Sequence, residues 1–392
     1  MKLEVDVLIV GGGPAGLSAG ISLAGCGVRT LICERKRLPV DKACGEGIMP
    51  TGLAHLERLG VKQHLYQGNY QPFAGIRYIS PGGQTASAPF QEGPGWGVPR
   101  VDLSAGLLRR ARELADLKII DGVSVKIGRI EDGRVQAQVG EELVSARLVV
   151  GADGLNSQVR RWARLQGPAQ PLQRWGARQH FPLTPWSDYV EVYMQGGLEA
   201  YVTPCGPSLI GIAFLWDRAR TWPLPGGKAL IPSLLEAFPE LLKRLDGVQP
   251  CDAPRSVGPM YRAAKRPASD GVLLIGDAAG YLDAITGEGI SLATAQALAL
   301  RETVVPVLRT PGREILTAQD LAAYSRAYHS IVRPYYRITR LVLWLSQHPA
   351  WVEMVIKILQ SRPGLFQQLL SANMGLVSFR EILRKALIGR GE

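Results

Sequence analysis

Residues 5–16 read VDVLIVGGGPAG, and this stretch carries the strongest structural signal in the chain. Its first six residues form an almost continuous apolar run, which is typical of a strand buried on both faces of a sheet. Gly11, Gly13 and Gly16 follow at the spacing GxGxxG, and residues 17–27 (LSAGISLAGCG) place small and apolar side chains at helical spacing. The order of strand, glycine-rich turn and helix predicts the first half of a βαβ unit.

The glycine spacing predicts a phosphate-binding turn. One glycine makes the turn tight, a second lets the backbone approach a pyrophosphate, and the third lets helix and strand pack closely, while the helix N-terminus faces the phosphates. Residues 29–34 (RTLICE) predict a second strand that ends at Glu34, 18 residues after Gly16. A carboxylate at this point accepts hydrogen bonds from ribose hydroxyls and disfavours a 2′-phosphate. We therefore expect the unit to bind FAD or NAD rather than NADP.

Three further segments lie along the chain: residues 98–103 (VPRVDL), 151–160 (GADGLNSQVR) and 276–291 (GDAAGYLDAITGEGIS). Together with the glycine turn they resemble the motifs of the flavoprotein monooxygenase and geranylgeranyl reductase superfamily, whose fold is that of para-hydroxybenzoate hydroxylase. The resemblance covers roughly residues 1–300 and implies that the dinucleotide is FAD.

The same resemblance implies roles for individual residues. Asp277 is expected to bind the ribityl chain, and Gly287 and Gly289 to open a helix whose N-terminus faces the pyrimidine end of the flavin, where the reduced ring carries negative charge. Asp153 and Arg100 are expected near FAD as well. The residues predicted to contact FAD are Gly11, Gly13, Pro14, Ala15, Gly16, Glu34, Arg35, Ala43, Cys44, Gly45, Gly47, Arg100, Val125, Asp153, Gly154, Asp277, Gly287, Gly289 and Ile290.

The electron donor is expected to be NAD(P)H, bound transiently over the flavin, as in the family that the motifs resemble. The chain has one complete GxGxxG and no CxxxxC pair. A disulfide reductase with a separate nicotinamide domain is therefore not predicted.

The reaction type divides between two branches of the superfamily. Hydroxylation of an aromatic or polyketide-like ring is the first prediction. Residues 42–47 (KACGEG) resemble the KxCG loop of geranylgeranyl reductases, which supports reduction of prenyl or lipid double bonds as the alternative. Ala284 replaces that branch's usual proline, and Tyr201 stands at the tryptophan position of its YxWxFP motif. A WxWxIP motif is absent, so halogenation is not favoured, and a flavin-binding protein without catalytic activity is an alternative of another class.

Cys44, Tyr201 and Trp96 are catalytic candidates without assigned roles. A metal role for Cys44 is not expected because no ligand lies nearby in the sequence; it is predicted to be either a thiol beside the flavin or a packing residue. Trp96, Tyr201, Phe214 and Trp216 are expected either to line a hydrophobic cavity or to belong to the core.

Two titratable residues, His180 and Glu191, lie on predicted strands of the central region. They either face the flavin or occupy cross-strand or surface positions. No residue is predicted as a general acid or base.

The chain is predicted to be an α/β protein in three parts. A Rossmann-like FAD-binding domain of the glutathione-reductase type, a two-dinucleotide-binding fold, takes residues 1–170 and 255–310, with a small antiparallel layer at 117–150. An inserted antiparallel sheet at 171–254 forms the substrate region. Residues 311–392 are expected to be helical, with breaks at Pro311, Pro334, Pro349 and Pro363.

Composition limits the location and the partners. No apolar run of the 392-residue chain reaches the length of a membrane span, and the five cysteines are dispersed, so we expect a cytoplasmic protein without a disulfide framework. The net charge is +11, yet no nucleic-acid module is visible, and nucleic acid is not an expected partner. Residues 324–392 hold ten Lys or Arg against three Asp or Glu. This excess predicts either a solvated helical face or peripheral contact with an anionic membrane; the expected substrate is a hydrophobic small molecule or lipid.

Overall fold

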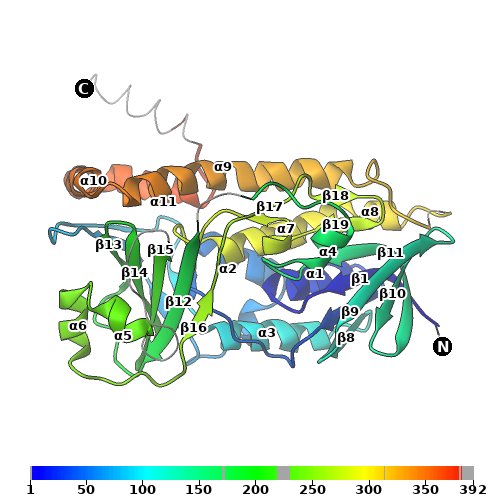
Figure 1. Ribbon diagram of the computed structural model, residues 1–392, viewed down its shortest axis with the longest axis horizontal. Helices are drawn as coiled ribbons and strands as arrows, with labels where there is room; N and C mark the ends of the chain where they lie inside the picture. The colour runs from blue at the N-terminus through cyan, green and yellow to red at the C-terminus, as the bar shows by residue number, and fades with distance from the viewer. Residues whose placement is uncertain (1, 170–172, 219–229, 313, 379–380, 382–392) are drawn as a thin grey trace.

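The computed structural model describes residues 2–169, 173–218, 230–312, 314–378 and 381. It is an elongated molecule in which two sheets lie side by side and helices cover them (Figure 1). The predicted βαβ unit is confirmed: β1 (Lys2–Val10) leads into α1 (Pro14–Ala24), which returns to β2 (Thr30–Glu34). β1 and β2 pair in parallel, as the right-handed crossover requires.

The first sheet has the order β18-β19-β11-β1-β2-β8, and its strands from β19 to β8 are parallel. Residues 7–9 of β1 and all five residues of β2 are buried because α1 and neighbouring helices cover them. β11 is long enough to pair with β19 along one half and with the antiparallel strand β10 along the other. The strands not yet given bounds are β8 (Leu117–Asp121), β9 (Val125–Glu131), β10 (Arg134–Val139), β11 (Glu142–Gly151), β18 (Ala268–Ser269) and β19 (Val272–Leu274).

The expected antiparallel layer at 117–150 is partly wrong. β9, β10 and β11 do pair antiparallel, but β8 joins β2 in parallel at the edge of the first sheet. The direction of β8 follows from its connection, since α3 (Arg100–Arg112) precedes it and packs against the same sheet as a crossover helix.

The second sheet has seven strands in the order β16-β12-β15-β14-β13-β5-β6. They are β5 (Gly75–Ile79), β6 (Thr85–Pro89), β12 (Arg174–Phe181), β13 (Tyr189–Gln195), β14 (Leu198–Gly206), β15 (Leu209–Asp217) and β16 (Arg255–Val257). The sheet thus recruits residues 75–89 and 255–257 from outside the expected range 171–254. It is also not wholly antiparallel, because β13 and β5 run parallel.

Two short helices of this region, α5 (Leu230–Leu235) and α6 (Pro239–Leu245), were not predicted; they bury their apolar side chains against Phe214 and Trp216 on one face of the second sheet. Two small sheets bridge the larger ones. They are built from β3 (Gly47–Ile48), β4 (Gln71–Phe73) and β7 (Gly95–Gly97), and from β17 (Arg262–Ala263) and β20 (Gly280–Tyr281).

The other helices complete the molecule. Their bounds are α2 (Pro50–Arg58), α4 (Gln158–Trp162), α7 (Gly289–Thr303), α8 (Val305–Leu308), α9 (Ala322–Ser346), α10 (Pro349–Ser361) and α11 (Pro363–Asn373), and 3-10 turns cover Lys62–His64 and Gly276–Ala278. α9 runs along one edge of the molecule, beside α7, and ends next to α10 and α11 (Figure 1).

The break expected at Pro334 is wrong, since α9 continues through it. The hydroxyls of Tyr324, Tyr328 and Tyr335 donate to the carbonyls of Leu274, Ala279 and Asp283, so the helix is fastened on both sides of the proline. These bonds and the buried apolar stripe outweigh the ~3 kcal/mol that an interior proline costs. Pro349 and Pro363 do begin new helices. No helix of the described residues combines the length and the apolar character needed to cross a bilayer.

Candidate active site

The glycine turn between β1 and α1 has the geometry of a phosphate cradle. Gly11 has φ +110°, and a Cβ added there would lie 2.4 Å from the carbonyl oxygen of Ala152. A Cβ on Gly16 would lie 1.8 Å from the carbonyl oxygen of Gly11. Gly13 differs, because the nearest atom to an added Cβ is Arg100 Nη2 at 4.0 Å. Close packing therefore requires glycine at positions 11 and 16. The lack of a side chain at Gly13 leaves the N-terminus of α1 open toward Arg100.

Glu34 ends β2 beside this turn. Its Oε2 accepts a hydrogen bond from the Gly12 amide at 2.7 Å, and its Oε1 accepts one from the Lys36 amide at 3.0 Å. The carboxylate is buried and fixed, and each oxygen retains a second lone pair. It therefore stands where the hydroxyls of an adenosine ribose are expected.

The DG segment follows β11 and the GD segment follows β19, and these two strands are neighbours in the first sheet. Asp277 lies in the 3-10 turn after β19. Arg160 donates to the carbonyls of Ala278 at 2.8 Å and Leu155 at 2.7 Å, so it joins the two turns. Asp153 Oδ2 caps α4 by accepting from the amides of residues 158 and 159, and its Oδ1 is buried without a hydrogen-bond partner among the described residues. A buried carboxylate oxygen without a partner can accept a hydrogen bond from the hydroxyl or amide of a ligand.

The charges around Asp277 favour a polyanion. Burial raises the pKa of the Asp277 carboxyl, and Lys42, Arg100 and Arg160 oppose that rise. Burial also lowers the pKa of Lys42, and the charge of Arg100 adds to this effect. Several cations surrounding one buried carboxylate leave an excess of positive potential in front of the α1 N-terminus, which suits a pyrophosphate.

A cavity of about 770 Å³ begins at this cradle. Fifteen of the nineteen residues predicted to contact FAD line it: Pro14, Ala15, Arg35, Ala43, Cys44, Gly45, Gly47, Gly154, Gly287, Gly289, Ile290 and the already described Gly13, Arg100, Asp153 and Asp277. Gly11, Gly16 and Glu34 are not among the described residues that line it. Val125 begins β9 opposite Val139, and is not among the described residues that line the cavity. The cradle therefore fits FAD, and the individual contacts stay predictions.

The far part of the cavity is apolar and lies between one face of the second sheet and helices α9, α10 and α11. Its walls include Ile76, Tyr78, Phe90, Val190, Val192, Met194, Tyr201, Leu215, Val342, Leu345, Val352, Val355, Ile356, Leu359, Phe366, Leu369, Leu370 and Met374. Because both parts belong to one cavity, a hydrophobic molecule held here has access to the end of the dinucleotide.

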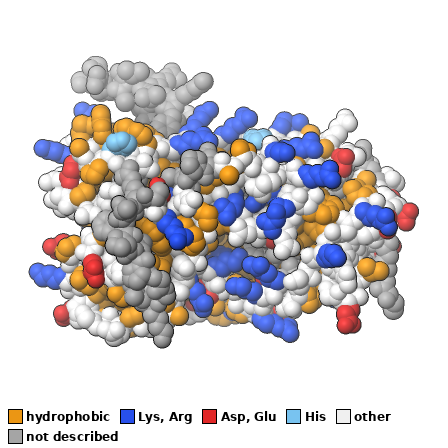
Figure 2. All heavy atoms as spheres, viewed as in Figure 1, with side chains coloured by type: hydrophobic (Ala, Val, Ile, Leu, Met, Phe, Trp, Pro, Cys, Tyr) orange, Lys and Arg blue, Asp and Glu red, His pale blue; other side chains and the backbone are white. Residues whose placement is uncertain are grey.

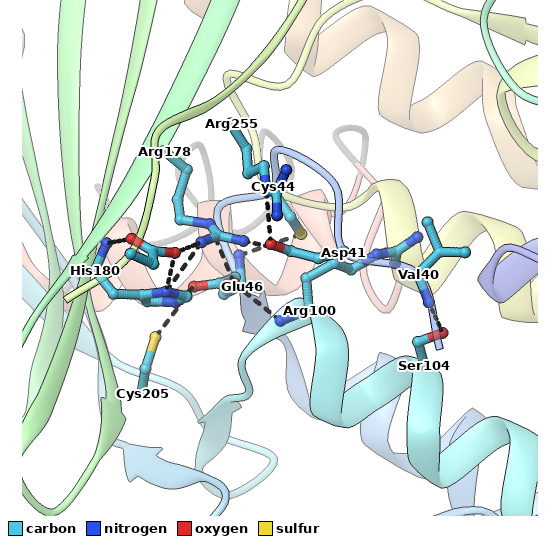
Figure 3. A network of polar contacts seen from close by, with 11 residues as sticks. Val40, Asp41, Cys44, Glu46, Arg100, Ser104, Arg178, His180, Cys205 and Arg255 are labelled. Atoms are coloured by element: carbon cyan, nitrogen blue, oxygen red, sulfur yellow. Dashed lines mark hydrogen bonds and ion pairs between the residues drawn. The ribbon is translucent and has the colours of Figure 1, made fainter. Parts of the chain in front are cut away.

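Residues 41–47 line the cavity, and Figure 3 shows Asp41, Cys44 and Glu46 of this segment between the second sheet and the start of α3. Cys44 lines the cavity, and its Sγ accepts from the Glu46 amide at 3.3 Å. Burial raises the pKa of this thiol, although Arg100 opposes the rise, so Cys44 is a protonated thiol at neutral pH. A role beside the flavin stays a prediction for this thiol, and so does the packing role.

Glu46 anchors this loop and was not singled out from the sequence. It is buried at φ +62°, and its Oε1 accepts from the Arg100 amide at 2.9 Å. Its Oε2 lies 2.7 Å from His180 Nε2 on β12, and Arg178 Nε lies 3.4 Å from Oε1. One carboxylate therefore connects the loop, the start of α3 and the second sheet.

His180 faces this loop but does not line the cavity. Its Nδ1 lies 2.9 Å from Asp252 Oδ2, so both ring nitrogens meet carboxylates (Figure 3). Burial and the charge of Arg178 lower the pKa of His180, but the hydrogen bond and charge of Glu46 and the hydrogen bond of Asp252 raise it by more, and the net shift is upward. Arg178 extends the network to Asp41 at 2.5 Å.

Glu46, His180 and Cys205 place their ligand-type atoms within 4.8 Å of one another. Residue types of this kind can hold a metal ion. Here the guanidinium of Arg178 and the imidazole of His180 already compensate the carboxylate of Glu46, so we assign no metal to the group.

The turn after β20 is tied to the second sheet by a separate network. Arg174 on β12 pairs with Glu199 at 2.6 Å and with Asp283 at 3.2 Å, all of them buried. Tyr201 lines the cavity, and its hydroxyl donates to the carbonyl of Ile285 at 2.8 Å. Burial holds the pKa of Tyr201 well above its usual value, so this phenol stays protonated.

Of the remaining candidates, Trp96, Trp216 and Glu191 are not among the described residues that line the cavity. Trp96 stacks on Tyr70 with 3.9 Å between ring centroids. Trp216 belongs to the core on the opposite face of the second sheet, and Phe214 is a core residue of the same cluster that also borders the cavity. Glu191 points to that opposite face as well, where Arg77 pairs with it at 3.0 Å.

Glu288 is a further titratable residue of the cavity wall that sequence reasoning missed. It precedes α7, between Gly287 and Gly289, and it is almost fully buried. Asn373 Nδ2 donates to its Oε1 at 3.3 Å. Burial raises the pKa of Glu288 to about 8, and Ser291 opposes the rise. A carboxylic acid that is protonated at neutral pH therefore faces the cavity; its only sequence signal was its position within TGEGI.

Comparison with known proteins agrees with this geometry. A family model described as FAD binding domain matches residues 4–204, just over half of the chain. The chain is 28% identical to 6-methylpretetramide 4-monooxygenase of Streptomyces rimosus, over 78% of this chain and 76% of that protein. It is 28% identical to digeranylgeranylglycerophospholipid reductase 1 of Methanothermobacter thermautotrophicus, over 74% of each, and 27% identical to menaquinone reductase of Mycolicibacterium smegmatis, over 86% and 82%.

Solved structures share the fold. The probable FAD-dependent monooxygenase pqsL from Pseudomonas aeruginosa matches with a TM-score of 0.74 at 20% identity, over 90% of this chain and 100% of that one. The halogenase PltM matches with a TM-score of 0.78 at 16% identity, over 95% and 82%. With the cradle, the charges and the family match in agreement, the chain belongs to the FAD-binding domain family and is an FAD-dependent oxidoreductase.

Proposed function

We propose that this enzyme takes electrons from NAD(P)H and acts on a hydrophobic substrate held between the second sheet and helices α9 to α11. The observation that carries the proposal is the continuity of the apolar part of the cavity with the dinucleotide cradle. An apolar wall binds a hydrophobic molecule by the hydrophobic effect and displaces water from the space beside the reacting atoms.

Different residues of the cavity would bind the cofactor, stabilise negative charge and hold a proton. Bound FAD supplies two-electron chemistry, in which electrons from NAD(P)H reach either dioxygen or the substrate. Lys42, Arg100 and the N-terminus of α1 would hold the pyrophosphate of FAD. The N-terminus of α7 at Gly289 supplies N–H groups that stabilise negative charge. Glu288 holds a proton at its carboxyl on the cavity wall.

Hydroxylation of a hydrophobic ring is the first candidate reaction. The relative from Streptomyces rimosus, named as a monooxygenase, supports it over three quarters of both chains. Insertion of one oxygen atom from dioxygen consumes one NAD(P)H and releases the second oxygen atom as water. In this reaction Glu288 and the Tyr201 hydroxyl are the groups of the cavity wall that orient a ring substituent by hydrogen bonds.

Reduction of a prenyl or lipid double bond is the second candidate. The protonated thiol of Cys44 on the cavity wall favours it, together with the relatives named as lipid and menaquinone reductases. A hydride reaches one carbon of the double bond, and a proton must reach the other. Cys44 and Glu288 are the protonated groups that line the cavity at the loop and at α7.

Product mass separates the two reactions. The purified enzyme is supplied with NAD(P)H and, in turn, a polycyclic aromatic polyketide and a polyprenyl quinone, under isotopically labelled dioxygen and anaerobically. Ring hydroxylation gains one labelled oxygen atom and stops without dioxygen. Double-bond reduction gains two hydrogen atoms and continues without dioxygen. If NAD(P)H oxidation is stimulated by neither substrate class and no product forms, the proposed hydrophobic substrate is wrong.

A further inference from the structure

We propose that the outer surface of α9 and α10 docks on an anionic phospholipid bilayer and that the cavity opens onto that bilayer. The proposal concerns binding alone and does not depend on which reaction the flavin performs. It rests on a basic stripe, an aromatic and apolar patch beside it, and a cavity wall that reaches the same patch.

The basic stripe follows the solvent face of α9. Arg326, Arg333, Arg337 and Arg340 are exposed, and their spacing of seven, four and three residues keeps them on one side of the helix. None of them pairs with a carboxylate within the described part of the chain. Glu353 is the one acidic residue of α9 and α10. Its carboxylate accepts hydrogen bonds from the Ser80 hydroxyl and the Gly82 amide, not from these arginines.

The stripe leads into an aromatic and apolar patch. Trp344 continues the same face of α9 and is 47% exposed, and Trp351 on α10 is 48% exposed. Their ring centroids lie 5.9 Å apart, and His348 stacks on Trp344 at 4.5 Å. Met354 and Ile358 continue the exposed face of α10. Figure 2 shows hydrophobic side chains gathered over α10, with Lys and Arg side chains along α9 beside them.

α10 is therefore apolar on two sides. Val352, Ile356 and Leu359 face the cavity, whereas Trp351, Met354 and Ile358 face outward. An outward apolar face with tryptophan at its edge and arginines alongside has the composition of an interfacial helix, which buries its apolar side among acyl chains and meets lipid phosphates with its cations.

The cavity reaches this surface at Leu341. This residue lines the cavity and is 53% exposed, so it belongs to both surfaces. It lies one turn before Trp344 on α9. A lipid-soluble molecule that leaves the bilayer beside Leu341 enters the apolar part of the cavity without crossing water.

Vesicle sedimentation tests the proposal with the full-length holoenzyme. The probes are phosphatidylcholine vesicles and vesicles of equal parts phosphatidylcholine and phosphatidylserine. Wild-type protein is expected to sediment with the anionic vesicles and to be released when salt rises from about 0.1 M to about 1 M. The triple variant R333E/R337E/R340E and the double variant W344Q/W351Q should each bind about tenfold more weakly or worse.

The matched control reverses three exposed cations at the opposite edge of the molecule, in R112E/K118E/K126E. It changes the net charge by the same amount and should bind like wild type. The proposal is overturned if wild type stays in the supernatant, or if the control loses as much binding as the α9 variant. It is also overturned if W344Q/W351Q converts a dimer into a monomer in light scattering without a change in vesicle binding, because the patch is then an interface between two copies.

Discussion

Glu46 Oε2 and His180 Nε2 lie 2.7 Å apart, and this contact joins the loop in front of the flavin cradle to the second sheet. The same carboxylate accepts a hydrogen bond from the backbone amide of Arg100 at the start of α3. The contact therefore sets the position of the cradle relative to the apolar part of the cavity.

Replacing Glu46 with Ala is expected to destabilise the fold by about 3 kcal/mol, because it leaves Arg178 and His180 buried with one carboxylate fewer. Urea unfolding of the purified protein measures the change. Glu302→Gln, at an exposed ion pair with Arg58, is the matched control and should cost less than about 1 kcal/mol. Equal effects of the two substitutions would show that the Glu46 network does not hold the fold together.

The stability should depend on pH through His180. Its pKa is raised in the folded state, so its contribution to the free energy of unfolding is fully present below the unfolded pKa of about 6.5 and is lost as pH rises through the folded value. We expect the urea midpoint to fall as pH increases from about 6.5 upward. His180→Gln should flatten that slope. An unchanged slope in the variant would assign the pH dependence to other groups.

Gly13→Ala should weaken FAD binding without unfolding the chain. An added Cβ has room in the protein, but it occupies the open face of the α1 N-terminus. Loss of one charged hydrogen bond to a phosphate costs ~1.5–3 kcal/mol, so FAD affinity should fall about tenfold or more. Fluorescence titration of the apoprotein with FAD measures it. Gly364→Ala, where an added Cβ meets no atom within 4 Å, is the control and should bind FAD normally.

Glu288 is expected to act in its protonated form. With its pKa raised to about 8, turnover should be constant near neutral pH and decline as pH rises above about 8. Glu288→Gln keeps the size and the neutral state but cannot give up a proton, so it should slow turnover and remove the alkaline decline while FAD remains bound. A variant with the wild-type rate and pH profile would exclude a proton-transfer role.

Structural features that depend on the spacing of residues close together in the chain could be predicted from the sequence. Gly11, Gly13 and Gly16 lie within one turn, and their steric requirements follow from a single strand and helix, so the cradle was predictable. The Glu46–His180 contact spans 134 positions and has no periodic signal. Likewise, β5 (residues 75–79) pairs with β13 over more than a hundred positions of the chain, and only the tertiary structure reveals that pairing. The expected break at Pro334 does not form because hydrogen bonds from tyrosines of α9 to distant carbonyls outweigh the local cost of the proline, and those contacts leave no signal in the neighbouring sequence.

The central claim is that one cavity holds both FAD and a hydrophobic substrate. The direct measurement is the visible absorption spectrum of the bound flavin during titration with a decyl-substituted naphthoquinone. Wild type should contain one FAD per chain and show a saturable spectral shift. Val192→Trp, which fills the apolar part, should keep FAD and lose the shift, whereas Val192→Ala should retain it. A shift of the same size and affinity in Val192→Trp would contradict the account, because the ligand would then reach the flavin by another route.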